Sequence, residues 1–140
     1  MVAPRFRQVV LDTTDPRMSA EFWRQFLGLT YRAGHEPPPN GAPDQVGGDW
    51  LNLLTNDGQA FLAFQNVETM TPPTWPDATV PRQLHLDLSV RSKAELRDAV
   101  DHAKELGGTV LLDRYGDAAE PLFVLTDPAG HPFCVFVVED

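Results

Sequence analysis

The strongest candidate for chemistry is a histidine followed two residues later by an aspartate, His85 and Asp87. Histidine is the side chain whose ordinary pKa allows proton exchange near neutral pH. In an extended strand, residues two positions apart point to the same side, so Asp87 can hydrogen-bond and tune the imidazole. We therefore take His85 and Asp87 as candidate catalytic residues, with His85 as a general base. The simpler alternative is a pocket histidine that Asp87 supports by a hydrogen bond.

A glutamine occupies the matching place near the start of the chain. Residues 6–12 and 84–90 both predict strands, because polar and apolar residues alternate in the second and a short apolar run marks the first. Gln8 would share one face of its strand with Val10 and Asp12. The apolar faces must pack on helices, so we expect Gln8 and His85 to point away from the core into a cavity enclosed by the two sheets.

Aromatic residues at or beside the inner strands supply the rest of the expected binding site. Pockets for small molecules are mostly apolar and aromatic, with a few placed polar groups. The predicted ligand-binding set is Gln8, Val10, Asp12, Trp50, Leu62, Phe64, Trp75, Cys134 and Phe136. Trp75 lies between prolines, which excludes a regular helix or a central strand. It is either a clasp that packs the linker over a pocket mouth or an exposed interface residue.

The elements that position these residues occur twice. Asp15 can cap a helix that follows the first strand, and Ser92 with Glu95 forms a capping-box pattern after the second. Gln8 precedes its cap by seven residues, as His85 does, and both predicted helices end in Leu-Gly. A left-handed terminal residue is easiest for glycine.

The end of each half is also repeated. Residues 53–64 can be laid against residues 124–136 as strand, tight turn and strand, with Gly58 matching Gly130 and Phe61 matching Phe133. Each half therefore predicts a βαβββ module: module one at about residues 5–66, a proline-rich linker at about 67–82, and module two at about 83–140. We expect these modules to form a single domain of the α+β class.

This layout resembles the vicinal oxygen chelate superfamily, to which glyoxalase I, bleomycin-resistance proteins and extradiol dioxygenases belong. The similar segments are LDTTDPRMSAEFWRQFLGL, PPTWPDATVPRQLHLDL and LTDPAGHPFCVFV. The resemblance covers nearly the whole chain apart from residues 36–48. It implies two tandem modules that form a partly open, curved, mixed β-sheet barrel with the helices outside.

The same resemblance implies where a metal would bind. Its metal-dependent members use one ligand from the first and one from the last strand of each module, which here gives Gln8, Leu62, His85 and Cys134. Leucine cannot ligate a metal, and a cysteine stands where a carboxylate is usual. We therefore expect no full metal-ligand set; a bound divalent metal would use Gln8 and His85 with Cys134 or Asp87.

Charge and cysteine content restrict the partners. The net charge is −9 and the 11 basic residues are scattered, which disfavours nucleic acid. The single cysteine, Cys134, excludes an internal disulfide, fits a reducing compartment and is expected to be a small buried hydrophobe. No signal-like or membrane-spanning apolar run is present, so a cytoplasmic protein is expected. The resemblance implies a homodimer, and Glu36–Gly48 is expected to act as a lid or a partner contact.

Three functions remain open from the sequence. The first, which we favour, is a small-molecule-binding protein of the glyoxalase-like or bleomycin-resistance-like kind, without chemistry. The second is a metal-dependent lyase, isomerase or oxygenase that uses Gln8 and His85. The third is a metal-free enzyme in which His85 is the general base.

Overall fold

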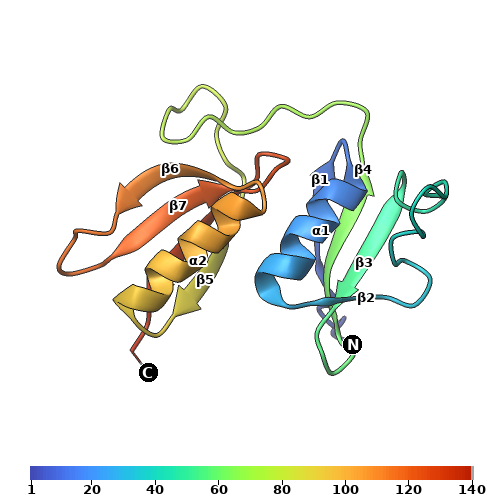
Figure 1. The fold of residues 1–140 in the computed structure, drawn as a ribbon, viewed down its shortest axis with the longest axis horizontal. Coiled ribbons are helices and arrows are strands. Elements are labelled where there is room, and N and C mark those ends of the chain that lie inside the picture. The colour runs from blue at the N-terminus through green and yellow to red at the C-terminus, as the bar shows by residue number, and fades with distance from the viewer. Residues whose placement is uncertain (140) are drawn as a thin grey trace. The chain divides into compact units, whose positions relative to one another are not determined.

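Strands and helices follow one another in the same order twice along the chain. The computed structural model describes residues 1–139, which divide after residue 70 into two compact parts, here unit 1 and unit 2. The elements of unit 1 are β1 Val9–Thr13, α1 Pro16–Leu27, β2 Thr30–Tyr31, β3 Trp50–Leu54 and β4 Ala60–Asn66. Those of unit 2 are β5 Leu86–Val90, α2 Lys93–Glu105, β6 Thr109–Arg114, β7 Leu122–Thr126 and β8 Pro132–Val137 (Figure 1).

The strands form two separate four-stranded sheets with equivalent topology. Their orders are β1-β4-β3-β2 and β5-β8-β7-β6. The pairs β1–β4 and β5–β8 are parallel and the other pairs are antiparallel. The α+β class and the duplicated βαβββ order are thus confirmed. Among residues 1–139 no strand pairing joins the two sheets, so they are not closed into one hydrogen-bonded barrel.

The helix ends are set by local contacts that the sequence predicts. Asp15 Oδ1 accepts a hydrogen bond from the Met18 backbone N–H at 3.0 Å, and Ser92 Oγ accepts one from the Glu95 N–H at 3.1 Å. These bonds satisfy amide groups that have no partner inside the helix. At the other end of α1, Gly28 takes the left-handed conformation with φ of 69°.

Each unit has its own apolar core between its helix and one face of its sheet. In unit 1 the α1 side chains Phe22 and Trp23 are buried and their rings meet edge to face at 5.1 Å. This confirms Trp23 as a core residue. In unit 2 the helix buries Leu96 and Val100. In each unit the apolar residues of the helix recur every three or four positions and so share one side of it. This side of the helix packs against the strands of the sheet.

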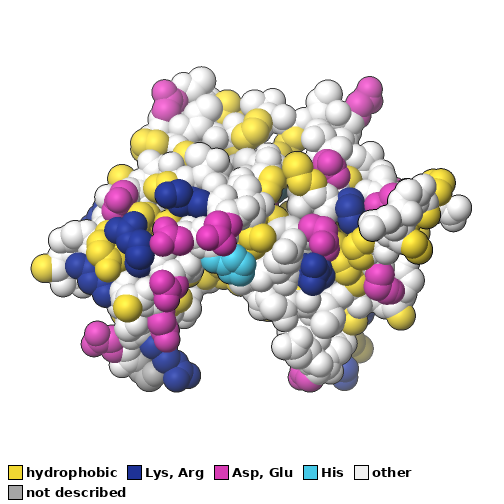
Figure 2. Space-filling view, in the orientation of Figure 1, with side chains coloured by type: hydrophobic (Ala, Val, Ile, Leu, Met, Phe, Trp, Pro, Cys, Tyr) yellow, Lys and Arg dark blue, Asp and Glu magenta, His cyan; other side chains and the backbone are white. Residues whose placement is uncertain are grey.

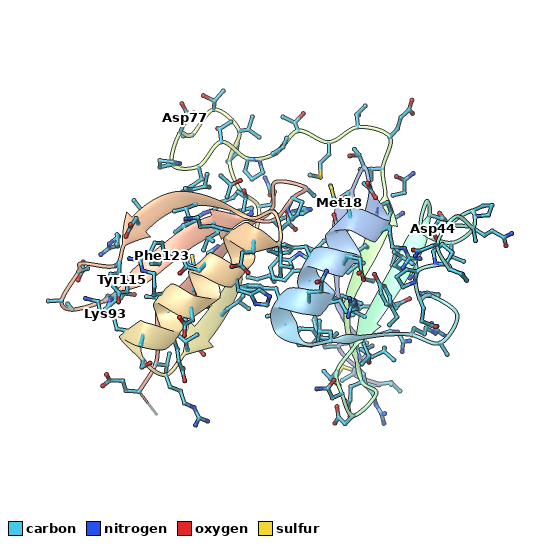
Figure 3. The ribbon with its side chains drawn as sticks, in the orientation of Figure 1. Met18, Asp44, Asp77, Lys93, Tyr115 and Phe123 are labelled. Carbon is cyan, nitrogen blue, oxygen red and sulfur yellow. The ribbon has the colours of Figure 1, made fainter. Side chains whose placement is uncertain are left out.

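The β6–β7 connection of unit 2 is held to α2 by aromatic and cationic side chains. Lys93 Nζ and Arg97 Cζ lie 4.5 Å and 4.2 Å from the centre of the Tyr115 ring, and Phe123 lies beside that ring (Figure 3). Such cation–π contacts stabilise a surface by roughly 0.5–1 kcal/mol each. They account for this basic cluster as a structural feature of unit 2.

The surface carries both signs of charge. On the face shown in Figure 2, Lys and Arg side chains lie scattered among Asp and Glu. No helix within residues 1–139 has the length and apolar character needed to cross a membrane.

Candidate functional site

Each sheet turns one face to the helix of its own unit; we call the other side the distal face. In unit 1 the strand register places Val10 beside Ala63 and Ala63 beside Asn52, so these three side chains share the distal face. Leu11 and Phe64 pair with each other one position further along the same two strands, and their side chains point to the opposite face, towards α1. In this way the alternation of each strand separates the core from the candidate site.

The first strand of each module begins later than the sequence predicts. β1 starts at Val9 and β5 starts at Leu86, so Gln8 and His85 each stand directly before the strand. The predicted starts at residues 6 and 84 are therefore wrong. The first residues of β1 and β5 that pair with a neighbouring strand are Val9, opposite Leu62, and Leu86, opposite Phe133. The two residues nevertheless occupy equivalent positions.

A β-bulge shifts the correspondence between the two modules by one residue. Leu53 pairs with Leu62, but Leu54 pairs with Ala60, so Phe61 is an extra residue on β4. The pairing of β7 with β8 is continuous. A bulge of this kind moves every later side chain to the other face of the strand.

The residue equivalent to Cys134 is consequently Ala63 and not Leu62. Ala63 pairs with Val10 as Cys134 pairs with Asp87. The alignment on the turn glycines was wrong beyond the bulge. Since alanine also lacks a donor atom, the last strand of unit 1 offers no metal ligand at this position.

Two members of the expected ligand-binding set face the core of unit 1. Leu62 and Phe64 are 2% and 0% exposed and lie in the rows that point to α1. They therefore lie on the opposite face from Gln8. Val10, which is 40% exposed, and Asp12 share the distal face with Gln8 as predicted.

In unit 2 three ionisable side chains come together on the distal face. His85 Nε2 lies 3.3 Å from Asp87 Oδ1, with side-chain exposures of 33% and 59%. One ligand atom from each of His85, Asp87 and Cys134 lies within 4.8 Å of the other two. Phe136, next to Ser89 in register, shares this face and adds an apolar surface.

The cysteine of this cluster is a weak nucleophile in the metal-free protein. Burial raises the pKa of the Cys134 thiol, the nearby Asp87 carboxylate raises it further, and Arg82 acts in the opposite direction. The thiol is therefore protonated near neutral pH. Cys134, which was predicted to be a small buried hydrophobe, is only partly buried.

In unit 1 the distal face carries a hydrogen-bonded chain of three side chains. Trp50 Nε1–H donates to Asn52 Oδ1 at 2.6 Å, and Asn52 Nδ2–H donates to Gln8 Oε1 at 2.9 Å. Asn52 is 3% exposed. Asn52 was not predicted from the sequence. It is the one amide in the apolar strand Trp50–Leu54 and lies two residues from Trp50, so the alternation of the strand places both side chains on the same face.

The family model of the Glyoxalase-like domain matches residues 8–136, nearly the whole of both units. The chain belongs to this family. It is thus a member of the vicinal oxygen chelate superfamily, as the resemblance implied. No curated protein matches the chain significantly.

Solved structures share the fold of this glyoxalase-like chain. A possible glyoxalase from Bacillus cereus is 19% identical, with a TM-score of 0.63 over 96% of this chain and 99% of that one. A glyoxalase/bleomycin resistance protein/dioxygenase family enzyme from Burkholderia phytofirmans PsJN is 18% identical, with a TM-score of 0.63 over 94% and 96%. The fosfomycin resistance protein FosX from Listeria monocytogenes, a mutant in complex with Mn(II) and 1S,2S-dihydroxypropylphosphonic acid, is 13% identical, with a TM-score of 0.64 over 98% and 93%.

The donor chemistry of the unit 2 cluster fits some metals better than others. One imidazole nitrogen, one carboxylate oxygen and one thiolate sulfur suit zinc or cobalt, whereas a manganese site is usually richer in oxygen. In a tetrahedral site, ligand atoms at about 2.0–2.3 Å from a common zinc ion lie roughly 3.3–3.8 Å apart. The three candidate atoms lie within 4.8 Å of one another, so the side chains would have to close by up to about 1 Å to hold the ion. A metal held by His85, Asp87 and Cys134 would leave one tetrahedral position open for a substrate oxygen, which it would polarise.

Trp75, the remaining aromatic residue of the expected set, lies in the segment before β5. Thr74 N–H donates to Val80 O at 2.9 Å, and Thr74 Oγ1 accepts a hydrogen bond from Val80 N–H at 2.9 Å, which closes this segment into a loop. Arg82 Cζ lies 5.0 Å from the centre of the partly buried Trp75 ring. The loop thus holds Trp75 through contacts within unit 2, which are compatible with either predicted role.

The loop between β2 and β3 is pinned to α1 by one arginine. Arg17 donates to both carboxylate oxygens of Asp44, at 2.8 Å and 3.0 Å, and to the backbone oxygens of His35 and Glu36. The Arg17 guanidinium holds the pKa of the Asp44 carboxyl below its usual range. The Glu36–Gly48 segment, which was expected to be a lid or a partner contact, is therefore anchored on its own unit.

Proposed function

We propose that this glyoxalase-like chain binds a small molecule on the distal face of unit 2, with His85 as its polar anchor. The observation that supports this proposal is the 3.3 Å contact of His85 Nε2 with Asp87 Oδ1 beside Cys134. The carboxylate orients the imidazole, and the Phe136 ring on the same face supplies apolar contact area. A few oriented polar groups next to an aromatic surface are typical of small-molecule sites.

A ligand screen on the full chain tests this proposal. Thermal-shift measurements would use phosphonates and aromatic drugs, including fosfomycin, 1S,2S-dihydroxypropylphosphonic acid and bleomycin, in buffer with EDTA. His85→Gln keeps a hydrogen-bonding side chain but removes the imidazole, so the affinity of a true ligand should fall about tenfold. The exposed α2 residue His102, changed to Gln, is the matched control. A library without a single binder, or binding that His85→Gln leaves intact, would contradict the proposal.

The same experiment separates binding from general-base catalysis. A binding protein returns its ligand unchanged. If His85 instead acts as a base, the ligand is converted by the wild type, and His85→Gln abolishes conversion while binding is retained. Product analysis by mass spectrometry distinguishes the two outcomes.

A metal-dependent enzyme is the second candidate, and the cluster of His85, Asp87 and Cys134 favours it specifically. Cobalt(II) is the sharpest probe, because a thiolate ligand gives it an intense near-ultraviolet absorption. We expect about one Co²⁺ per chain, with this band lost in Cys134→Ser. Zinc binding measured by calorimetry should release a proton from the thiol. Less than a tenth of an equivalent of each metal would eliminate this candidate.

Four further predictions are retained as part of the proposal. The two units are expected to act as one domain, which requires a single cooperative unfolding transition. A homodimer is expected from the family resemblance, and light scattering of the purified chain measures it. A cytoplasmic location, tested by cell fractionation, and an absence of affinity for nucleic acid follow from the composition and the net charge of −9.

A further inference from the structure

The amide of Gln8 has a fixed orientation that follows from its neighbours. An indole nitrogen can only donate a hydrogen bond, so the atom of Asn52 that meets Trp50 Nε1 at 2.6 Å must be the oxygen Oδ1. The other terminal atom of Asn52 is then the nitrogen, and the atom of Gln8 that it meets at 2.9 Å must be Oε1. One donor-only group thereby determines the orientation of both amides.

The backbone holds Asn52 in this position. Its N–H donates to His35 Nδ1 at 2.9 Å and its carbonyl oxygen accepts from Arg32 N–H at 3.1 Å. Asn52 reaches Gln8 across β4, where the intervening residue is Ala63, which is 0% exposed. A larger side chain at this place would separate the two amides.

The outward atom of Gln8 is consequently the Nε2 amide nitrogen with its two protons. None of the described residues accepts a hydrogen bond from this group. We infer that Gln8 Nε2 is a recognition point for a ligand oxygen, in a carboxylate, phosphonate or carbonyl group, with Asn52 and Trp50 as positioning residues. Gln8 thus acts as a donor in unit 1, whereas a metal ligand would have to use the oxygen that Asn52 already engages. This inference rests on the proposed function in one respect, that the chain takes small-molecule ligands.

The substitution Asn52→Asp reverses the orientation without changing the shape of the side chain. A carboxylate accepts hydrogen bonds from both Trp50 Nε1 and Gln8 Nε2, so the Gln8 oxygen would turn outward. Gln65→Glu is the matched control: it adds the same charge to the same distal face at a position opposite Trp50 in register. Trp50→Phe removes the donor that sets both amides and adds no charge.

The test is a titration of the ¹⁵N-labelled full chain with methylphosphonate in EDTA, observed by NMR. The Gln8 side-chain NH₂ resonances should shift with methylphosphonate and not with tetramethylammonium, which has no acceptor. The apparent affinity should fall about tenfold or more in Asn52→Asp and remain within about twofold in Gln65→Glu. Trp50→Phe should give a reduced response, because either orientation of the two amides becomes available.

The same spectra separate this inference from the proposed function. Gln8 resonances that do not move with methylphosphonate, or that move equally in Asn52→Asp and Gln65→Glu, would overturn the inference. If the His85 ring resonances move while Gln8 is silent, the proposed function stands and the donor role fails. If Gln8 responds and the His85 ring does not, the donor role stands and the His85 anchor fails for this class of ligand.

Discussion

Replacing His35 by asparagine should make the chain more tolerant of acid. His35 Nδ1 accepts a hydrogen bond from the Asn52 N–H at 2.9 Å, which requires a neutral ring with its proton on Nε2. Burial lowers the pKa of His35 below its ordinary value, the charge of Arg32 and that of Arg17 lower it further, and Glu36 opposes them. Protonation therefore removes the acceptor that holds the β2–β3 loop on Asn52.

The direction of the effect follows from linkage. The unfolded chain binds a proton on His35 more readily than the folded chain, so the stabilisation is complete above a pH of about 6.5 and declines as the pH falls through the folded pKa. The net value of the bond is about 1 kcal/mol. At the unfolding midpoint of a chain of this length, that corresponds to about 4 °C.

Thermal unfolding followed by circular dichroism at pH 7.5, 6.5, 5.5 and 5.0 measures this effect. The amide oxygen of His35→Asn can accept from the Asn52 N–H without titrating. The midpoint of the variant, relative to wild type, should therefore rise by about 4 °C between pH 7.5 and pH 5.0. The loss of stability that follows from protonation of carboxylates is the same in both proteins, so it cancels in this difference. A difference that stays constant with pH, or one that the exposed-residue variant His102→Asn reproduces, would refute the reasoning.

Two other predictions concern unit 2. In urea unfolding, Gly130→Ala should lower the free energy of unfolding by about 1–3 kcal/mol more than Gly58→Ala does. Both glycines have positive φ, but only at Gly130 would a new Cβ lie 2.6 Å from Pro72 Cβ. Equal losses of stability in the two variants would show that this contact is unimportant. Alkylation of Cys134 by iodoacetamide in EDTA should be slow at pH 7 and faster in Asp87→Asn. The reason is that burial, and to a smaller extent the Asp87 carboxylate, raises the pKa of the thiol. An unchanged alkylation rate in Asp87→Asn would contradict this explanation.

The features that the sequence predicts best are those that depend on neighbouring residues. The caps at Asp15 and Ser92 and the glycine end of α1 are confirmed, because each needs only a side chain and an amide within one helical turn. The alternation that sets Asp87 on the face of Cys134 is likewise a local property of the strands.

The features that it does not predict depend on pairing between strands. The bulge at Phe61 changes which residue corresponds to Cys134, and no residue type near it marks the insertion. Strand starts also depend on the partner strand and not on the apolar run alone. Asn52 was missed because its importance comes from Gln8, which lies 44 residues earlier in the chain.

The corrected register shows how the two modules divide their chemistry. The row Val10, Ala63 and Asn52 of unit 1 corresponds to the row Asp87, Cys134 and Val124 of unit 2. At each position in this row, one unit has a polar or ionisable side chain and the other an apolar one.

This division explains why the two distal faces suit different groups. Ala63 is small enough for the Asn52 and Gln8 amides to meet above it, and a ligating side chain in its place would occupy that space. The equivalent cysteine instead lies beside an aspartate and a histidine. The distal face of unit 1 therefore presents a hydrogen-bonded pair of amides on the same side as Asp12, whereas that of unit 2 brings an imidazole, a carboxylate and a thiol together.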